Sequence, residues 1–291
     1  MDIGGTKMAA GLVDAAGSLT CDARVPTPVS AGPDQLWEAL AGLVASVLEG
    51  APPGSLLVCG VGCGGPMTAD GEEVSPLNIP GWRRFPLRRR LHDLTGVPTF
   101  VDNDAKALAL AEGWIGGARR CDDFVAMVVS TGIGGGLVVD GRLLDGRLGN
   151  AGHIGHVVVE PDGRPCRCGG RGCLEAEASG RAIAEITGRP AALADPATVE
   201  RTGTLVGRAV ASVANLLDLS LAVVAGSVAL GFGQPFFDAA RRELSARAGF
   251  DYSSATRIVP AGLADRGPLI GAGAVGWRGV TGWRGISGAR R

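Results

Sequence analysis

The sequence predicts an α/β fold divided into two domains, and three observations carry this prediction. The chain has 291 residues, whereas one domain typically has roughly 150. Short apolar segments alternate with longer ones in which apolar residues recur at helical spacing, a pattern typical of sheets covered by helices. Similar glycine-rich strand-turn-strand units occur at 2–13 and 130–139, and this repetition indicates a duplicated domain with a ligand between its copies.

The first half is predicted to begin with two strands joined by a tight glycine turn. Gly4 and Gly5 permit that turn, and Pro33 followed by Asp34 is a start signal for the first helix. In that helix the leucines and valines fall on one face, as burial requires. The predicted elements are a strand from residue 1, a strand at 8–13, a helix at 35–48, strands at 56–61 and 97–101, and a helix at 105–114.

The second half is predicted to continue the alternation around a cysteine-rich excursion. Its elements are strands at 124–129 and 136–139, a helix at 204–217, a strand at 221–225 and a last helix near 271–277. We place a small domain at 1–103, completed by that last helix, and a large domain at 104–277, with the excursion at 153–175. Residues 278–291 contain four glycines and are predicted to be a disordered tail.

Composition and charge exclude several classes of function. Lys and Arg total 28 and Asp and Glu total 29, so the net charge of -1 gives no general attraction for nucleic acid or an acidic membrane. The apolar stretch at 219–232 is shorter than the roughly 20 residues of a membrane-spanning helix. The first residues have neither the basic nor the apolar region of a secretory signal, so we expect a cytoplasmic protein.

Two glycine-rich turns are candidate phosphate-binding loops, because glycines let consecutive backbone N–H groups converge on an anion. Taken alone, the first turn is better explained as an ordinary hairpin. Together the two loops indicate a nucleotide triphosphate such as ATP, with Asp2 holding Mg²⁺ through water. The candidate ATP and Mg²⁺ residues are Asp2, Gly4, Gly5, Thr6 and Lys7 in the first loop and Ser130, Thr131, Gly132 and Gly134 in the second.

One imidazole and three thiols of the excursion form a candidate metal site. His156, Cys166, Cys168 and Cys173 provide a closed Cys3His set, which is typical of structural zinc (Zn²⁺). A disulfide is the weaker alternative, because Cys166 and Cys168 are too close in sequence to pair easily and three thiols leave one over. The chain has seven cysteines, and the other four are expected to be small buried residues.

The acidic segment 102–104 connects a predicted strand to a predicted helix. A carboxylate at this junction can accept the proton of a hydroxyl nucleophile during phosphoryl transfer, a reaction that needs little other covalent help. The alternative is that Asp102 or Asp104 only caps the helix that follows. The presence of both glycine loops favours the catalytic interpretation, with Asp104 as the base.

The two glycine loops and the segment 102–104 resemble the ROK family of bacterial sugar kinases and repressors, and the resemblance extends from Asp2 to about Gly276. It implies a two-domain actin/hexokinase/Hsp70-like (ribonuclease H-like) fold closing over sugar and ATP. It also implies a homo-oligomer, either a dimer or a tetramer. The residues implied for the sugar are Gly65, Asn78, Asn103, Asp104, His156 and Glu175, and Gly226 is implied for the adenosine side. Asn78 and Gly226 are also explained as turn residues.

Residue 153 is where the sequence departs from many glucokinases of that family. They have Glu in a Gly-Glu-x-Gly-His pattern, whereas this chain has His153 between Gly152 and Ile154. A carboxylate accepts from two sugar hydroxyls, while an imidazole offers one donor and one acceptor. His at this position resembles some bacterial N-acetylmannosamine kinases, although one residue seldom fixes specificity alone.

We therefore expect an ATP-dependent kinase of a hexose hydroxyl, with glucose as the main candidate. The alternative is an amino sugar, N-acetylmannosamine or N-acetylglucosamine. A sugar-sensing or repressor-type protein without catalysis is less favoured, because the base and both loops are present and the repressors carry a DNA-binding domain ahead of the first loop. Family members usually have a few apolar residues before Asp2, so we expect added upstream residues to change the melting temperature or the ATP affinity.

Overall fold

The computed structural model describes residues 1–282, and its first half forms a mixed five-stranded sheet. The strands are β1 (Asp2–Ile3), β2 (Lys7–Val13), β3 (Leu19–Pro26), β4 (Cys59–Cys63) and β5 (Thr99–Asn103). Their order across the sheet is β3-β2-β1-β4-β5. The central strand β1 is antiparallel to β2 and parallel to β4, so the loop after β1 leaves the middle of the sheet.

The second half repeats this arrangement. Its strands are β6 (Phe124–Val129), β7 (Ile133–Val139), β8 (Arg142–Leu143), β9 (Leu221–Ala225) and β10 (Arg257–Pro260). The order is β10-β9-β6-β7-β8, and β6 is antiparallel to β7 and parallel to β9. Each glycine-rich unit therefore joins the central strand of a sheet to its antiparallel neighbour, as the repetition in the sequence predicts.

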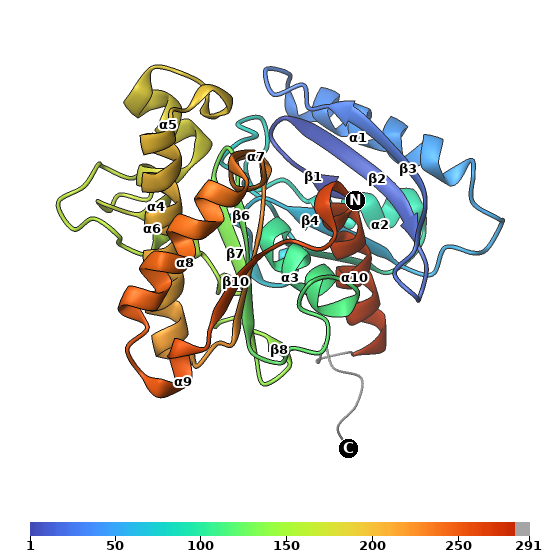
Figure 1. The fold of residues 1–291 in the computed structure, drawn as a ribbon. Coiled ribbons are helices and arrows are strands. Elements are labelled where there is room, and N and C mark those ends of the chain that lie inside the picture. Colours follow the sequence, from blue (N-terminus) through green and yellow to red (C-terminus); the bar gives the residue numbers. More distant parts are fainter. Residues whose placement is uncertain (283–291) are drawn as a thin grey trace.

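Helices cover both sheets and fill the space between them, which confirms the predicted α/β class (Figure 1). The α-helices are α1 (Pro33–Leu48), α2 (Leu87–Thr95), α3 (Asp104–Trp114), α4 (Leu174–Ala178), α5 (Gly180–Thr187), α6 (Pro196–Leu217), α7 (Ser227–Phe232), α8 (Gln234–Arg247), α9 (Asp251–Ser254) and α10 (Gly267–Thr281). Short 3₁₀ turns are η1 (Ala69–Gly71), η2 (Ile154–His156), η3 (Ala191–Leu193) and η4 (Ala264–Arg266). In Figure 1, α3 and α10 lie side by side between the sheets, and they pack against each other.

Glycines allow this central layer to pack unusually closely. A Cβ placed on Gly60 of β4 would lie 1.9 Å from the carbonyl oxygen of Ala272 in α10. A Cβ on Gly271 would lie 2.3 Å from the carbonyl oxygen of Ala107 in α3. Real Cβ atoms do not approach oxygen so closely, so any larger residue would push the helices apart. The position of α3, which follows the segment 102–104, is therefore fixed by backbone contacts.

The hydrophobic core has a cluster at each sheet and a third around α3 and α10. Trp82 and Phe85 stack within the first cluster with ring centroids 4.4 Å apart. Phe236 of α8 is fully buried in the second, where α8 packs on α6. Within residues 1–282, no helix has both the length and the apolarity required to cross a bilayer.

The structure corrects several predicted boundaries. The strand expected at 56–61 is β4 at Cys59–Cys63, because these are the residues that pair with β5. The helix expected at 204–217 is α6, which begins at Pro196 after the N-cap Asp195. The glycines of the second loop belong partly to β7, which begins at Ile133 and pairs with β6. The helix expected to end near 277 continues to Thr281, so the start of the predicted disordered tail is helical, and 283–291 lie outside the described residues.

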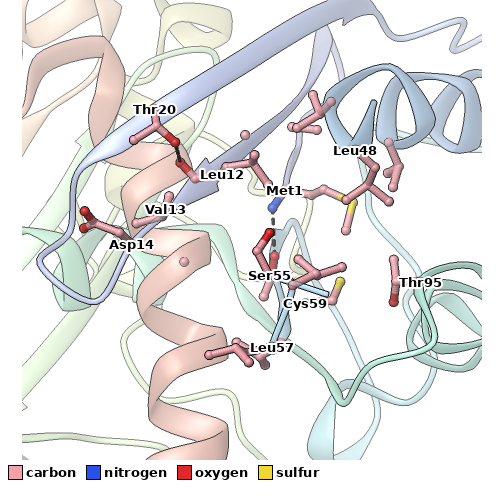
Figure 2. A pocket seen from close by; sticks show the side chains of 18 of the residues that line it. Met1, Leu12, Val13, Asp14, Thr20, Leu48, Ser55, Leu57, Cys59 and Thr95 are labelled. Carbon is pink, nitrogen blue, oxygen red and sulfur yellow. Dashed lines mark hydrogen bonds between the residues drawn. The ribbon is translucent and has the colours of Figure 1, made fainter. Parts of the chain in front are cut away.

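An apolar cavity of about 410 Å³ lies between β2 and β4, beside Met1 (Figure 2). The Met1 amino group donates a hydrogen bond to the Gly60 carbonyl at 2.7 Å, and its burial lowers the pKa of this amine. On the β1 side, β2 is paired only at Met8 and Ala9. The rest of β2 faces the cavity on that side, while its other edge pairs with β3. This part of β2 is remote from the first glycine loop.

Candidate active site

The candidate base stands where β5 ends and α3 begins. The Asn103 side chain accepts a hydrogen bond from the Ala105 N–H at 3.0 Å, which makes Asn103 the N-cap of α3. The N-cap position is therefore that of Asn103 and not that of Asp102 or Asp104, although Asp104 also contacts the start of the helix. Asp104 is the first residue of the helix, and its Oδ1 accepts from the same N–H at 2.9 Å. The predicted sugar residue Asn103 and the predicted base are thus fixed by one helix start.

The carboxylate of Asp104 faces that of Asp2 in the candidate site, where Asp104 is exposed to solvent and Asp2 is half-buried. Loss of hydration beside the surrounding protein raises the pKa of Asp104, because it disfavours the ionised carboxylate. Burial, and then the charge of Asp104, raise the pKa of Asp2 to about 6. A Cβ on Gly62 would lie 3.5 Å from Asp104 Cα and 3.9 Å from Asp2 Oδ1, so glycine leaves the space between them open. Two carboxylates in this arrangement fit a hard divalent cation such as Mg²⁺.

The first glycine loop is a hairpin turn partly closed by its own backbone. The Gly4 N–H donates to the Lys7 carbonyl at 3.0 Å, and the Thr27 hydroxyl donates to the Gly4 carbonyl at 2.7 Å. Since the Gly4 N–H is used inside the turn, anion binding falls to the residues that follow it. A Cβ on Gly5 would lie 2.6 Å from the Cβ of Asn78. The structure therefore places the predicted sugar residue Asn78 against the first phosphate loop.

The second glycine loop contacts the turn after β9. The Ser130 hydroxyl lies 2.9 Å from that of Ser227, and the Ser130 carbonyl accepts from the Gly180 N–H at 2.7 Å. Gly226 has a φ of 101°, and a Cβ there would lie 2.3 Å from the Val129 carbonyl oxygen. Only glycine fits this position without strain. The second loop and Gly226, both predicted to bind ATP, are thus neighbours.

Glu175 and His153 stand on the other side of Asp104. Glu175 Oε2 accepts from the Ile133 N–H at 2.9 Å, beneath the second loop. Burial and the neighbouring His156 lower the pKa of His153, while the charges of Asp104 and Glu175 act in the opposite direction. A neutral imidazole presents one donor and one acceptor nitrogen. The predicted sugar residues therefore surround Asp104 from both halves of the chain, with Gly65 lying beside Asn103.

The four predicted zinc ligands come together at the excursion. The ligand atoms of His156, Cys166, Cys168 and Cys173 all lie within 4.8 Å of one another. Cys166 Sγ lies 3.7 Å from His156 Nδ1, and Cys168 Sγ lies 3.7 Å from Cys173 Sγ. A tetrahedral zinc ion with bonds of about 2.0–2.3 Å holds its ligands roughly 3.5–3.8 Å apart. The donor set and its spacing therefore fit zinc.

A buried carboxylate attaches the excursion to the rest of the second half. Glu177 is 3% exposed and accepts from the Arg164 N–H at 2.6 Å and from Arg201 Nη2 at 2.7 Å. Arg201 belongs to α6, so this ion pair joins the metal ligands to a long core helix. His156 is three residues beyond His153, and Cys173 is two residues before Glu175. The candidate metal ligands are thus close in sequence to both His153 and Glu175.

Sequence reasoning missed a group of charges directly behind Asp104. Lys106 is 2% exposed and forms ion pairs with Asp102 and Asp145, and Arg278 pairs with the same two carboxylates. The pair of Asp102 and Lys106 joins β5 to the first turn of α3, so it is not a pair on one helix face, and four-residue spacing gave no sequence signal for it. Nothing in the sequence indicated Asp145 or Arg278. Arg83 donates to the carbonyls of residues 76, 79 and 82 around Asn78.

Known proteins with the same architecture cover nearly the whole chain. The ROK family glucokinase from Streptomyces griseus, solved with glucose and AMPPNP, has a TM-score of 0.82, 29% identity, and coverage of 95% of this chain and 98% of that one. The ROK hexokinase from Thermus thermophilus has a TM-score of 0.79, 35% identity, and coverage of 97% and 98%. The N-acetylmannosamine kinase of Citrobacter koseri is 40% identical over 248 residues, 80% of this chain and 84% of that protein.

The fold and the solved structures define the class, which is that of sugar kinases with the actin/hexokinase fold. The ROK family model matches residues 1–277, and the chain belongs to the ROK family. This confirms both the resemblance and the fold that the resemblance implies.

Proposed function

We propose that this protein uses ATP to phosphorylate a hydroxyl of N-acetylmannosamine. The observation that carries the choice of sugar is the 40% identity with the N-acetylmannosamine kinase of Citrobacter koseri. His153 supports it, because the sequence departs there from the glucokinase pattern. Glucose, our main expectation from the sequence, becomes the second candidate, favoured by the likeness to the Streptomyces griseus glucokinase.

Asp104 is the proposed base that accepts the proton of the attacking hydroxyl. A carboxylate whose pKa is raised toward the working pH accepts a proton more readily, and loss of hydration acts on Asp104 in this direction. The variant Asp104→Asn keeps the size of the side chain but removes the proton acceptor. We expect it to lose turnover and to keep its zinc content and melting temperature. Turnover near the wild-type rate in this variant would exclude Asp104 as the base.

ATP is proposed to lie across the two glycine loops, with its adenosine side toward Gly226. The N–H groups after Gly4 and the hydroxyls of Ser130 and Thr131 are the candidate phosphate contacts. Mg²⁺ bound through Asp2 neutralises charge on the phosphates. We propose that the halves 1–103 and 104–277 close on the substrates, which excludes water and prevents ATP hydrolysis from competing.

The proposed zinc has a structural role. A Cys3His set leaves no coordination position for water or substrate, so such an ion does not take part in the reaction. It would hold His153 and Glu175 at their places beside Asp104. The homo-oligomeric state that the family resemblance implies is part of this proposal, and size-exclusion chromatography with light scattering tests it.

The test of the sugar is ADP release by zinc-replete protein with Mg²⁺-ATP and a panel of sugars. The panel contains N-acetylmannosamine, N-acetylglucosamine, glucosamine, mannose and glucose. We expect kcat/KM for N-acetylmannosamine to exceed that for glucose by about tenfold or more. The variant His153→Glu restores the carboxylate of the glucokinase pattern and should lower this ratio. His92→Glu makes the same change on the exposed side of α2 and is the matched control.

Each outcome of the panel decides between the candidates. Turnover concentrated on glucose would make His153 a neutral replacement within a glucose site and would exclude N-acetylmannosamine as the preferred sugar. A preference for N-acetylmannosamine that His153→Glu leaves unchanged would remove His153 from specificity. No turnover with any sugar, by protein that binds both zinc and ATP, would favour a sugar sensor.

A further inference from the structure

Lys106 is a buried cation with a complete set of acceptors. Its side chain is 2% exposed, and its Nζ lies 2.9 Å from Asp102 Oδ1 and 2.9 Å from Asp145 Oδ1. The third acceptor is the carbonyl oxygen of Gly149 at 3.2 Å. An ammonium group has three donors, so each is accounted for. A lysine is almost never buried to this degree unless it is paired. Burying its charge costs desolvation free energy, which suggests that Lys106 has a specific structural role.

Arg278 of α10 completes a network of four charges with Lys106, Asp102 and Asp145. Its Nη2 lies 2.5 Å from Asp145 Oδ2, and its Nη1 lies 3.5 Å from Asp102 Oδ2. Two cations and two carboxylates balance one another, which reduces the electrostatic penalty of placing them behind the candidate active site. Asp102 lies in β5 of the first sheet, one residue before its end, whereas Asp145 follows β8 in the second. The network therefore connects the two halves of the molecule.

The loop after β8 is the segment that this network holds. Its two ends meet where the Asp145 carbonyl accepts from the Ala151 N–H at 3.0 Å. Lys106 Nζ donates two hydrogen bonds to this loop, one to the Asp145 carboxylate and one to the Gly149 carbonyl. The loop contains glycines with positive φ at 146, 149 and 152, so its own backbone has little intrinsic preference for one shape. Immediately after these residues comes His153.

We infer that Lys106 and Asp145 are positioning residues, which hold the 145–152 loop and thereby set the place of His153 opposite Asp104. Lys106 lies two residues after Asp104 on α3, so one helical turn carries both the candidate base and the anchor of the opposing loop. The network of Lys106, Asp102, Asp145 and Arg278 thus fixes the position of the loop before His153 relative to Asp104. The kinetic part of this inference rests on the proposed function, whereas the loop mobility does not.

The experiment compares Asp145→Asn and Lys106→Met with wild type. Asp145 is 48% exposed, so its asparagine variant is the one expected to fold without difficulty. Asp238 of α8, also 48% exposed and paired with Arg241, gives the matched control Asp238→Asn. We measure amide hydrogen exchange of residues 145–152 by mass spectrometry, and KM for sugar, KM for ATP and kcat on the same preparations.

We expect exchange in 145–152 to accelerate about tenfold in Asp145→Asn and the sugar KM to rise by a similar factor, since the neutral amide weakens the charged contacts with Lys106 and Arg278. The ATP KM, kcat and the Asp238→Asn control should stay close to wild type. Lys106→Arg should recover part of the sugar KM that Lys106→Met loses. If Lys106→Met fails to fold, Asp145→Asn carries the test alone.

Two results would overturn the inference. Unchanged exchange of 145–152 in Asp145→Asn would show that the network does not hold the loop. A lower kcat together with a higher KM for both sugar and ATP in Asp145→Asn, matched by the same changes in Asp238→Asn, would show a general structural effect. Wild-type protein without sugar turnover would instead refute the proposed function, and the exchange data would still decide whether the loop depends on Asp145.

Discussion

Replacing Asp2 with asparagine should stabilise the free protein at neutral pH while abolishing its kinase activity. Asp2 faces Asp104 across the open space at Gly62, and in the absence of a cation the Asp2 carboxylate is both partly desolvated and repelled by the charge of Asp104. Asparagine has nearly the same shape and no charge. The variant therefore removes the repulsion along with the proposed Mg²⁺ ligand. Sites built for a charged ligand commonly carry such a stability cost.

The size of this effect on the free energy of unfolding follows from the pKa of Asp2, which rises from 3.8 to about 6 on folding. Such a shift destabilises the folded state by about 3 kcal/mol when Asp2 is fully ionised, relative to its protonated form. Because the folded pKa is the higher one, the folded state holds the proton more tightly. The stability from this proton is complete below pH 3.8 and is lost as the pH rises through about 6. Linkage places about 1.4 kcal/mol of that loss between pH 5 and pH 8.

The assay is urea unfolding of nucleotide-free, Mg²⁺-free protein at several pH values from 5 to 8. The free energy of unfolding of Asp2→Asn should gain about 1.4 kcal/mol relative to wild type across this range. Asp22→Asn, on the outer strand β3, reports the effect of removing a carboxylate that is farther from Asp104. Parallel pH curves for wild type and Asp2→Asn would refute the reasoning, because they would show that neither burial nor the charge of Asp104 raises the pKa of Asp2 on folding.

Three further predictions concern the metal, the central packing and the cavity. Cys168→Ser should reduce bound zinc, measured by mass spectrometry, from about one ion per chain to well below one, and wild type without zinc would exclude the site. Gly60→Ala should lower the free energy of unfolding in urea by about 3 kcal/mol. Gly42→Ala, where the added methyl meets open space, should raise it by up to about 1 kcal/mol. Equal effects of the two substitutions would contradict the close contact between Gly60 and Ala272. About four apolar residues added before Met1 should raise the melting temperature by extending β1 along the cavity, and an unchanged melting temperature would contradict this.

Local patterns in the sequence were sufficient to predict much of the site. The two glycine loops, the segment 102–104 and the Cys3His set each lie within a short stretch, and their chemistry depends on residue type and spacing. The repeated glycine unit also predicted a duplicated arrangement, which appears as two sheets of the same strand order. The candidate metal cluster was recognisable in this way because most of its residues are close in sequence, with Cys166, Cys168 and Cys173 within eight positions.

Contacts between distant segments were decided only by the tertiary structure. Asp145 is 39 residues from Lys106 and 133 residues from Arg278, and these three charges meet only because α3 and α10 pack together behind the loop after β8. The end of α10 was predicted to be disordered because its glycines disfavour a helix, but packing and ion pairs on Arg278 override that preference. Sequence spacing determined which groups could carry the chemistry. The packing of helices between two sheets determined which of them face one another.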